Sequence, residues 1–150
     1  MFRGNHPTKV DEKGRLKLPS AFKALVDAQS VTKFFVTSRD GRRAEIWPLP
    51  EWEKVEARLN SRSSALDDAA EEYMTLVNYY GQEVEMDNPG RVLLPQILRT
   101  KARLDGDVTV MGMRVFLAVD NRGELEKRLP SEGMSEERRR RVDAMLRTDQ

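Results

Sequence analysis

The hydrophobic and polar positions of this chain follow one pattern that occurs twice. After a turn at residues 11–14, Leu16 and Leu18 alternate with charged residues at the two-residue period of a β-strand. A proline follows, and it suits the first turn of a helix because that turn does not need the missing N–H group. Residues 87–95 repeat the turn, the alternation and the proline. The pattern therefore predicts a turn, a strand and a short helix in each half of the chain.

Two stretches rich in aromatic and β-branched residues follow the first expected helix. Residues 33–37 and 44–47 are predicted to be paired strands, because an Asp-Gly hairpin signal separates them. The second half has the same order, with strands expected at residues 108–111 and 115–119. The two copies of the turn lie 76 residues apart. Such a repeat is typical of one supersecondary unit that is used twice.

Residues 49–80 change to a helical period. Apolar residues recur there at helical spacings, which predicts two amphipathic helices. Ser63 or Ser64 is expected to cap the second helix, and Leu66 and Tyr80 are expected to belong to its buried stripe. The aromatic residues of this segment could form a platform for stacking bases. Their acidic neighbours favour a helix-pair core instead.

These elements predict an α+β fold with three parts. Residues 1–62 are expected to hold the first half-repeat and the helix after it. Residues 63–120 are expected to hold a linking helix and the second half-repeat, and residues 121–150 a polar helical tail.

The tail contains four consecutive arginines, residues 138–141, which have two interpretations. The run could bind phosphate groups. It could equally be a solvated helix face on which Glu136 and Glu137 pair with Arg140 and Arg141. Because these acids lie so close to the run, a solvated or lightly docked helix is the favoured interpretation. The apolar stripe of this helix is narrow and consists of Val142, Met145 and Leu146.

Composition excludes several kinds of site. The chain has no cysteine, which removes disulfides, thiolate metal sites and a cysteine nucleophile. His6 is the only histidine, so neither a Ser-His-Asp triad nor a histidine zinc site is expected. No apolar run approaches the roughly 20 residues of a transmembrane helix, and no signal peptide is recognised. We expect a soluble cytoplasmic protein with no metal, no cofactor, no membrane partner and no small-molecule substrate.

Charge is unevenly distributed along the chain, although the net charge is only +1. Residues 1–48 carry a net charge of +5, residues 49–85 a net charge of −6 and residues 86–150 a net charge of +2. An acidic middle between basic ends predicts one face that attracts a polyanion and another that repels it. An ordinary ionic surface is the alternative interpretation, and charge alone favours it.

The two turns carry the candidate chemistry. Each has an Asp at its start and a Gly-Arg pair at its exit, in the pattern DxxGR. Backbone geometry explains the Asp and the Gly, because Asp bonds its own backbone and Gly adopts positive φ. It does not require Arg15 or Arg91, yet both copies keep the arginine. Since the planar guanidinium suits phosphate or guanine, the paired turns predict a DNA-binding surface.

The aspartates of the turns could hold each guanidinium in a fixed pose, which lowers the entropy lost on binding. We expect the first turn to bind more strongly, because more basic residues surround it. The predicted DNA-binding residues are Arg15, Arg91, Lys13, Gly14, Asp11, Asp87, Gly90, Lys17, Arg3 and Lys9.

An enzyme is the competing class of protein. Asp11 and Asp87 could form a carboxylate dyad that shares one proton. The neighbouring arginines argue against such a dyad, because they lower both pKa values whereas the dyad needs one of them raised. No phosphate-binding glycine-rich loop and no zinc signature occurs in the sequence. No catalytic residues are therefore predicted.

Several motifs together resemble one bacterial family. They are Phe2-Arg3-Gly4, residues 11–15, Leu18-Pro19, residues 45–48, residues 51–53 and residues 87–95. In combination they look like MraZ, a family of bacterial transcriptional regulators with two AbrB-like halves. The resemblance covers about residues 1–119. It implies two swapped-hairpin β/α half-repeats that form one barrel-like domain with a pseudo-twofold axis. One departure is that residues 115–119 replace the Glu-Ile-Trp-like strand usual in the second half.

The resemblance also implies a mode of action. It predicts ring-shaped homo-oligomers that bind short direct repeats upstream of the cell-division and cell-wall gene cluster, including the chain's own promoter, through the DxxGR turns. The expected partners are double-stranded DNA at the nucleoid and further copies of the chain. The alternative is a protein-interaction or antitoxin-like assembly module with minor DNA binding, which the acidic helix pair and the arginine-bearing tail favour.

Overall fold

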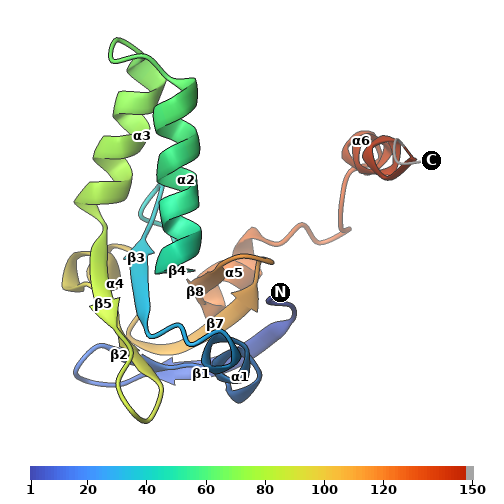
Figure 1. The fold of residues 1–150 in the computed structure, drawn as a ribbon. Helices are drawn as coiled ribbons and strands as arrows, with labels where there is room; N and C mark the ends of the chain where they lie inside the picture. Colours follow the sequence, from blue (N-terminus) through green and yellow to red (C-terminus); the bar gives the residue numbers. More distant parts are fainter. Residues whose placement is uncertain (148–150) are drawn as a thin grey trace.

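Eight β-strands form one antiparallel sheet that curves into a nearly closed barrel in the computed structural model, which describes residues 1–147 (Figure 1). The strands are β1 (Asn5–Val10), β2 (Arg15–Lys17), β3 (Lys33–Thr37), β4 (Ala44–Pro48), β5 (Gln82–Glu85), β6 (Arg91–Leu93), β7 (Gly106–Gly112) and β8 (Leu117–Asn121). Their order in the sheet is β5-β3-β4-β8-β7-β1-β2-β6. The edge strands β5 and β6 are consecutive in sequence, so the second DxxGR turn joins the two edges.

Strand pairing relates the two halves of the chain by an approximate twofold axis. β1 of the first half pairs with β7 of the second, and β5 of the second half pairs with β3 of the first. β2 pairs with its own counterpart β6, and β4 pairs with its counterpart β8. Leu16 lies opposite Val92, and the pairing of β2 with β6 is symmetric about that point. The halves interleave, which confirms the predicted α+β fold of two swapped half-repeats.

The strand pattern of the sequence determines which side chains fill the barrel. Leu16 and Leu18 are buried, as are their counterparts Val92 and Leu94. Burying such a side chain fully stabilises the fold by roughly 1.5–3 kcal/mol. A slip of one residue would bury Arg15 in place of Leu16, so the register is strongly specified. This register places the charged side chains of β2 and β6 outside the barrel.

Six helices occur within residues 1–147. They are α1 (Ser20–Ala28), α2 (Leu49–Arg62), α3 (Asp68–Tyr79), α4 (Gln96–Lys101), α5 (Arg122–Arg128) and α6 (Glu136–Arg147). Pro19 and Pro95 occupy the N-cap positions of α1 and α4 rather than the first turn. α2 and α3 form a hairpin that stands away from the barrel, and α6 lies apart at the end of an extended segment (Figure 1). None of these helices is long and apolar enough to cross a membrane.

Two expectations for the helical segments were wrong, and a third lies partly outside the described residues. Asp67 caps α3 by accepting a hydrogen bond from the Ala70 N–H at 3.1 Å, whereas Ser63 donates to the Leu59 carbonyl and closes α2. Leu66 is 90% exposed, because it precedes α3 and lies in the loop between the helices. The predicted tail extends to residue 150, and its last three residues lie outside the described part of the chain. Its described part consists of α5, a connecting segment and α6.

Candidate nucleic-acid interface

The first DxxGR turn is a closed network around one carboxylate. Asp11 Oδ1 accepts hydrogen bonds from the backbone N–H groups of Lys13 and Arg15, at 3.0 and 2.9 Å. Asp11 Oδ2 accepts a bond from Arg15 Nε at 2.9 Å. Gly14 has a φ of 86°, a conformation that costs a side-chain-bearing residue about 1–2 kcal/mol. The Asp therefore fixes both the turn and the direction of the arginine.

The second turn repeats this network with one difference. Asp87 accepts bonds from Arg91 N and Arg91 Nε, both at 2.7 Å, and Gly90 has a φ of 92°. Pro89 occupies the position of Lys13 and has no N–H, so the third bond to the carboxylate is missing. The second carboxylate therefore holds its arginine through two bonds instead of three.

The two turns lie side by side and are bonded to each other. The N–H of Leu18 donates to the Gly90 carbonyl at 2.9 Å, and the N–H of Leu94 donates to the Gly14 carbonyl at the same distance. Lys17 lies opposite Arg91 in the pairing of β2 with β6. These reciprocal bonds make the two turns one rigid surface, as the repeat in the sequence predicted.

Both arginines retain binding capacity. Their side chains are 29% and 32% exposed for Arg15 and Arg91. Within residues 1–147, each guanidinium is bonded to protein only through Nε, so its two terminal nitrogens remain for a ligand. A planar guanidinium that is held through Nε suits bidentate bonding to phosphate or to the guanine edge.

The electrostatics of the turns keep both carboxylates ionised. The pKa of Asp11 is lowered, chiefly because the Arg15 N–H donates to it. For Asp87, burial is the largest influence and raises the pKa, but the hydrogen bonds and charge of Arg91, together with the charge of Arg15, outweigh it. Two carboxylates that are both more acidic than usual cannot share a proton near neutral pH. This agrees with the argument against a carboxylate dyad.

Acid titration tests this arrangement. A depressed pKa means that the ionised Asp favours the folded turn, so its contribution is present above the ordinary value of 3.8 and lost as the pH falls through the lowered pKa. We expect the side-chain carboxyl carbons of Asp11 and Asp87 to titrate below pH 3.8 in an NMR titration. A titration midpoint at or above pH 3.8 for either residue would contradict the bonding of that Asp to its arginine.

Two basic residues that the sequence did not single out complete the surface. A Cβ added at Gly14 would lie 2.3 Å from Cζ of Arg99, and one at Gly90 would lie 2.7 Å from Cδ of Lys23. Lys23 and Arg99 are counterparts in the two halves, on α1 and α4. Each one covers the glycine of the other half's turn. Aligning the repeat beyond its proline would have found them, because both lie four residues after it.

Gly14 has two roles, because its backbone adopts a positive φ and its lack of a side chain leaves room for Arg99. Replacing it by alanine tests both. We expect a loss of about 1–2 kcal/mol in the free energy of unfolding, because φ is positive. We also expect weaker DNA binding, because the new Cβ displaces the Arg99 guanidinium. Gly106→Ala is the matched control, since φ is 88° there and no atom lies within 4 Å of the added Cβ. Urea unfolding and DNA titration of both variants test this, and equal DNA affinity would contradict the role of Arg99.

The remaining predicted residues are distributed unevenly. Lys13 and Lys17 lie on the turn surface and are exposed. Lys9 is exposed on β1, where its Nζ lies 4.0 Å from the Asp107 carboxylate. Arg3 precedes β1 and is separated from the turn by the whole strand, about 20 Å. The structure therefore brings the predicted residues together, with Arg3 as the exception.

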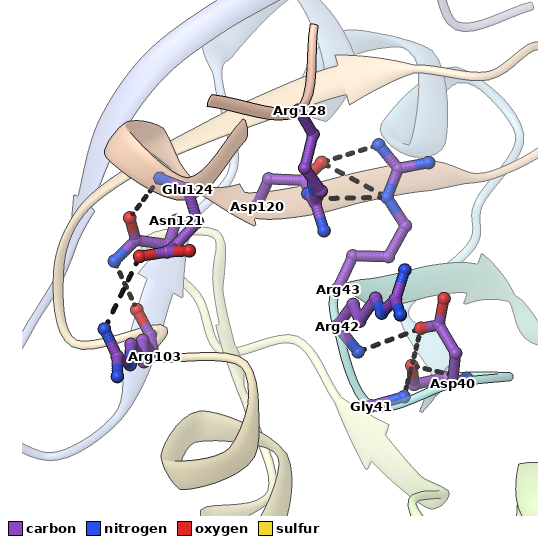
Figure 2. Close-up of polar contacts among 10 residues, drawn as sticks. Asp40, Gly41, Arg42, Arg43, Arg103, Asp120, Asn121, Glu124 and Arg128 are labelled. Atoms are coloured by element: carbon purple, nitrogen blue, oxygen red, sulfur yellow. Dashed lines mark hydrogen bonds and ion pairs between the residues drawn. The ribbon is translucent and has the colours of Figure 1, made fainter. Parts of the chain in front are cut away.

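A second polar cluster lies on the barrel beside α5 (Figure 2). The Asp120 carboxylate has no exposed surface and accepts from Arg43 Nη2 at 2.6 Å and from Arg128 at 2.5 Å. Arg103 lies 3.4 Å from Glu124. Because Arg128 and Glu124 belong to α5, these contacts attach that helix to the barrel. No local pattern in the sequence indicated them, since the partners are separated by up to 77 residues.

The other half of the barrel holds an aromatic pair at the positions equivalent to Arg43 and Asp120. The pairing of β4 with β8 is symmetric about Glu45 and Ala118, so these strands correspond at an offset of 73 residues. The counterparts of Arg43 and Asp120 are therefore Phe116 and Trp47, whose rings stack with centroids 4.5 Å apart. The strand expected at residues 115–119 is β8 and begins two residues later, at Leu117. Phe116 lies just before it and packs against Trp47 of β4. The same pair of positions is apolar in one half and ionic in the other.

An interleaved barrel with an Asp-clamped arginine on each of two adjacent turns defines a class of proteins built from one half-repeat used twice. One family model, described as "MraZ protein, putative antitoxin-like", matches the chain at residues 1–74 and again at residues 81–143. The chain belongs to this family of bacterial transcriptional regulators. The family is not enzymatic, which confirms the prediction that the chain is not an enzyme.

Individual relatives agree with this assignment. The chain is 53% identical to a protein named Transcriptional regulator MraZ from Acidobacterium capsulatum, over 91% of this chain and 93% of that protein. It is 44% identical to the protein of the same name from Koribacter versatilis, over 87% of this chain and 89% of the relative. The identity to the one from Thiobacillus denitrificans is 34% over 75% of both chains.

Proposed function

We propose that this protein binds double-stranded DNA in a sequence-specific manner through its two DxxGR turns and thereby regulates transcription in the cytoplasm, at the nucleoid. The single observation that carries the proposal is the pair of clamped guanidiniums. Arg15 and Arg91 are fixed by Asp11 and Asp87 and lie on turns that are bonded to each other. Within residues 1–147 their terminal nitrogens make no hydrogen bond or ion pair. The names of the relatives, which describe transcriptional regulators, support the same function.

The surface around the turns supports a polyanionic ligand. Lys13, Lys17 and Arg99 add positive charge to the two arginines, whereas the charge of Lys23 is balanced by Asp27 at 2.7 Å. Phosphate contacts would position the turns, and base contacts would supply specificity. The first turn should contribute more than the second, because Lys13 and the third bond to Asp11 occur only there.

Self-assembly into a ring is part of the proposal. One chain with a net charge of +1 is expected to bind DNA weakly. Several copies that engage several direct repeats could raise the avidity by about 10²–10⁴-fold if their geometry matches the spacing of the repeats. We propose that these repeats lie upstream of the protein's own gene, at the head of the division and cell-wall gene cluster.

Titration of the protein with its own upstream DNA tests the proposal. The wild-type chain should bind a fragment with intact direct repeats more tightly than the same fragment with the repeats scrambled, at equal length and salt concentration. Repeats spaced by about one helical turn would fit a ring of identical subunits. Equal binding to the two fragments at every salt concentration would contradict sequence-specific recognition.

The rival hypothesis is an assembly module in which DNA binding is minor. The family description includes the term antitoxin-like, and the α2–α3 hairpin is acidic. A protein partner that binds the chain tightly in nuclease-treated samples, together with no preference for the repeats, would favour this hypothesis over DNA recognition.

A further inference from the structure

α6 is a helix whose faces differ in charge. At 3.6 residues per turn, Val142 and Leu146 share a face with Arg138 and Arg139. The three acids of the helix fall outside this face, and Glu136 is paired with Arg140 at 2.8 Å. No residue of α6 is buried, and both Val142 and Leu146 are exposed. The helix therefore presents a basic, apolar stripe to its surroundings.

The internal repeat indicates what α6 lacks. The family model matches residues 1–74 and 81–143, so α5 and α6 of the second half correspond to α2 and α3 of the first. α3 packs against α2 in a cluster that contains Trp52 and Val77. α5 has 7 residues where α2 has 14, and it is too short to give α6 the same support. α6 thus corresponds to the packed helix α3, but the helix before it, α5, is half the length of α2.

The start of the tail is fixed by the contacts of Figure 2. Arg128 is bonded to buried Asp120, and Glu124 lies beside Arg103, so α5 is held on the barrel. Residues 129–135 can then span at most about 25 Å before α6 begins. In one chain this segment carries α6 away from the α2–α3 hairpin (Figure 1). A second copy is therefore the natural partner.

The α2–α3 hairpin has a groove that is complementary to this stripe. A hollow of about 510 Å³ lies between the two helices near their connecting loop. Leu59 and Met74 supply apolar surface, and Glu56, Asp67 and Glu71 supply negative charge. Residues 49–79 carry a net charge of −4, whereas α6 carries a net charge of +2.

We propose that α6 of one copy docks into the groove between α2 and α3 of a neighbouring copy. Val142 and Leu146 contact the apolar floor near Leu59 and Met74, and Arg138 and Arg139 pair with the acids of the groove. This is the binding of an amphipathic helix in a groove. It joins the tail of one subunit to the hairpin of the next, and it rests on the proposed self-assembly. The hairpin lies at the end of the molecule opposite the loops that join β1 to β2 and β5 to β6, so this interface lies away from the DNA-binding turns (Figure 1).

Charge reversal on one face of α6 tests the docking. Arg138→Glu with Arg139→Glu should weaken self-association of the DNA-free full chain about tenfold or more, because the ion pairs with the groove are lost and like charges then face each other. Arg140→Glu with Arg147→Glu is the matched control, because it makes the same charge change on the other side of the helix. Sedimentation velocity over a range of protein concentrations measures both. Glutamate preserves helix propensity, which circular dichroism checks.

A compensating variant makes the test specific to the groove. Glu56→Lys with Glu71→Lys should weaken self-association alone, and adding Arg138→Glu and Arg139→Glu in the same chain should restore it. Two results would overturn the docking while leaving self-assembly intact. One is unchanged self-association of the Arg138→Glu, Arg139→Glu variant, and the other is a compensating variant that does not regain self-association. A wild-type chain that stays monomeric at all concentrations would overturn both. If the wild-type chain assembles normally but does not bind its upstream DNA, only the proposed function is contradicted.

Discussion

Replacing both Arg15 and Arg91 by alanine is expected to reduce affinity for the upstream DNA by about 10²-fold or more. Each anchored arginine is a charge-assisted donor whose contact to a base is worth roughly 1–3 kcal/mol. Neither side chain is part of the buried core, so the barrel should remain folded. Loss of Arg15 alone should cost more than loss of Arg91 alone, because the first turn is the more basic one. Fluorescence anisotropy with repeat-containing DNA measures all three variants.

Two comparisons give this prediction its specificity. Arg62→Ala with Arg114→Ala removes the same charge from the end of α2 and from a residue bridged to Phe2, away from the turns, and should change affinity less than threefold. Arg15→Lys with Arg91→Lys keeps the charge but loses the Nε bonds to the aspartates. We expect its affinity to lie between those of the wild-type and alanine variants. An equal loss of DNA affinity in the alanine pair and the distant pair would show that the turns are not the DNA-binding surface.

Replacing Asp120 by alanine is expected to give the largest loss of stability, about 3 kcal/mol in the free energy of unfolding. Its carboxylate has no exposed surface and holds Arg43 and Arg128, and breaking a buried pair costs roughly 3–5 kcal/mol. The lower end of that range applies because both arginines are partly exposed and regain water.

Urea unfolding measures this effect. Asp107→Ala is the control, because that carboxylate is exposed and lies 4.0 Å from Lys9, an ion pair of at most about 1 kcal/mol. Asp120→Ala should also release α5, which proteolysis within residues 122–135 would detect. A variant as stable as the wild type would show that the ionic cluster does not hold the helix.

The sequence predicted the elements that follow from local rules. The repeated DxxGR turn and the alternation after it located β2 and β6, and the burial of Leu16 and Leu18 followed from their two-residue period. The α+β fold and its swapped halves came from the family resemblance. The arginines stood out because turn geometry explains every other residue of the motif.

Contacts between the halves could not be predicted in the same way. Lys23 and Arg99 lie over the turns only because the strands interleave, which no local pattern reveals. Asp120 is buried because Arg128 and the distant Arg43 of the other half neutralise it, although aspartate is normally exposed. Leu66 was expected to be buried, but the helix begins after it and leaves it in the loop. These errors arise where tertiary structure overrides the local pattern.

Photocross-linking tests the central claim, that the paired turns contact DNA, most directly. A photoactivatable residue at position 13 or 88 lies on a DxxGR turn, and one at position 66 lies at the exposed loop of the α2–α3 hairpin. We predict cross-links to repeat-containing DNA from positions 13 and 88, stronger at 13, and none from position 66. Cross-links from position 66 with none from either turn would contradict the account.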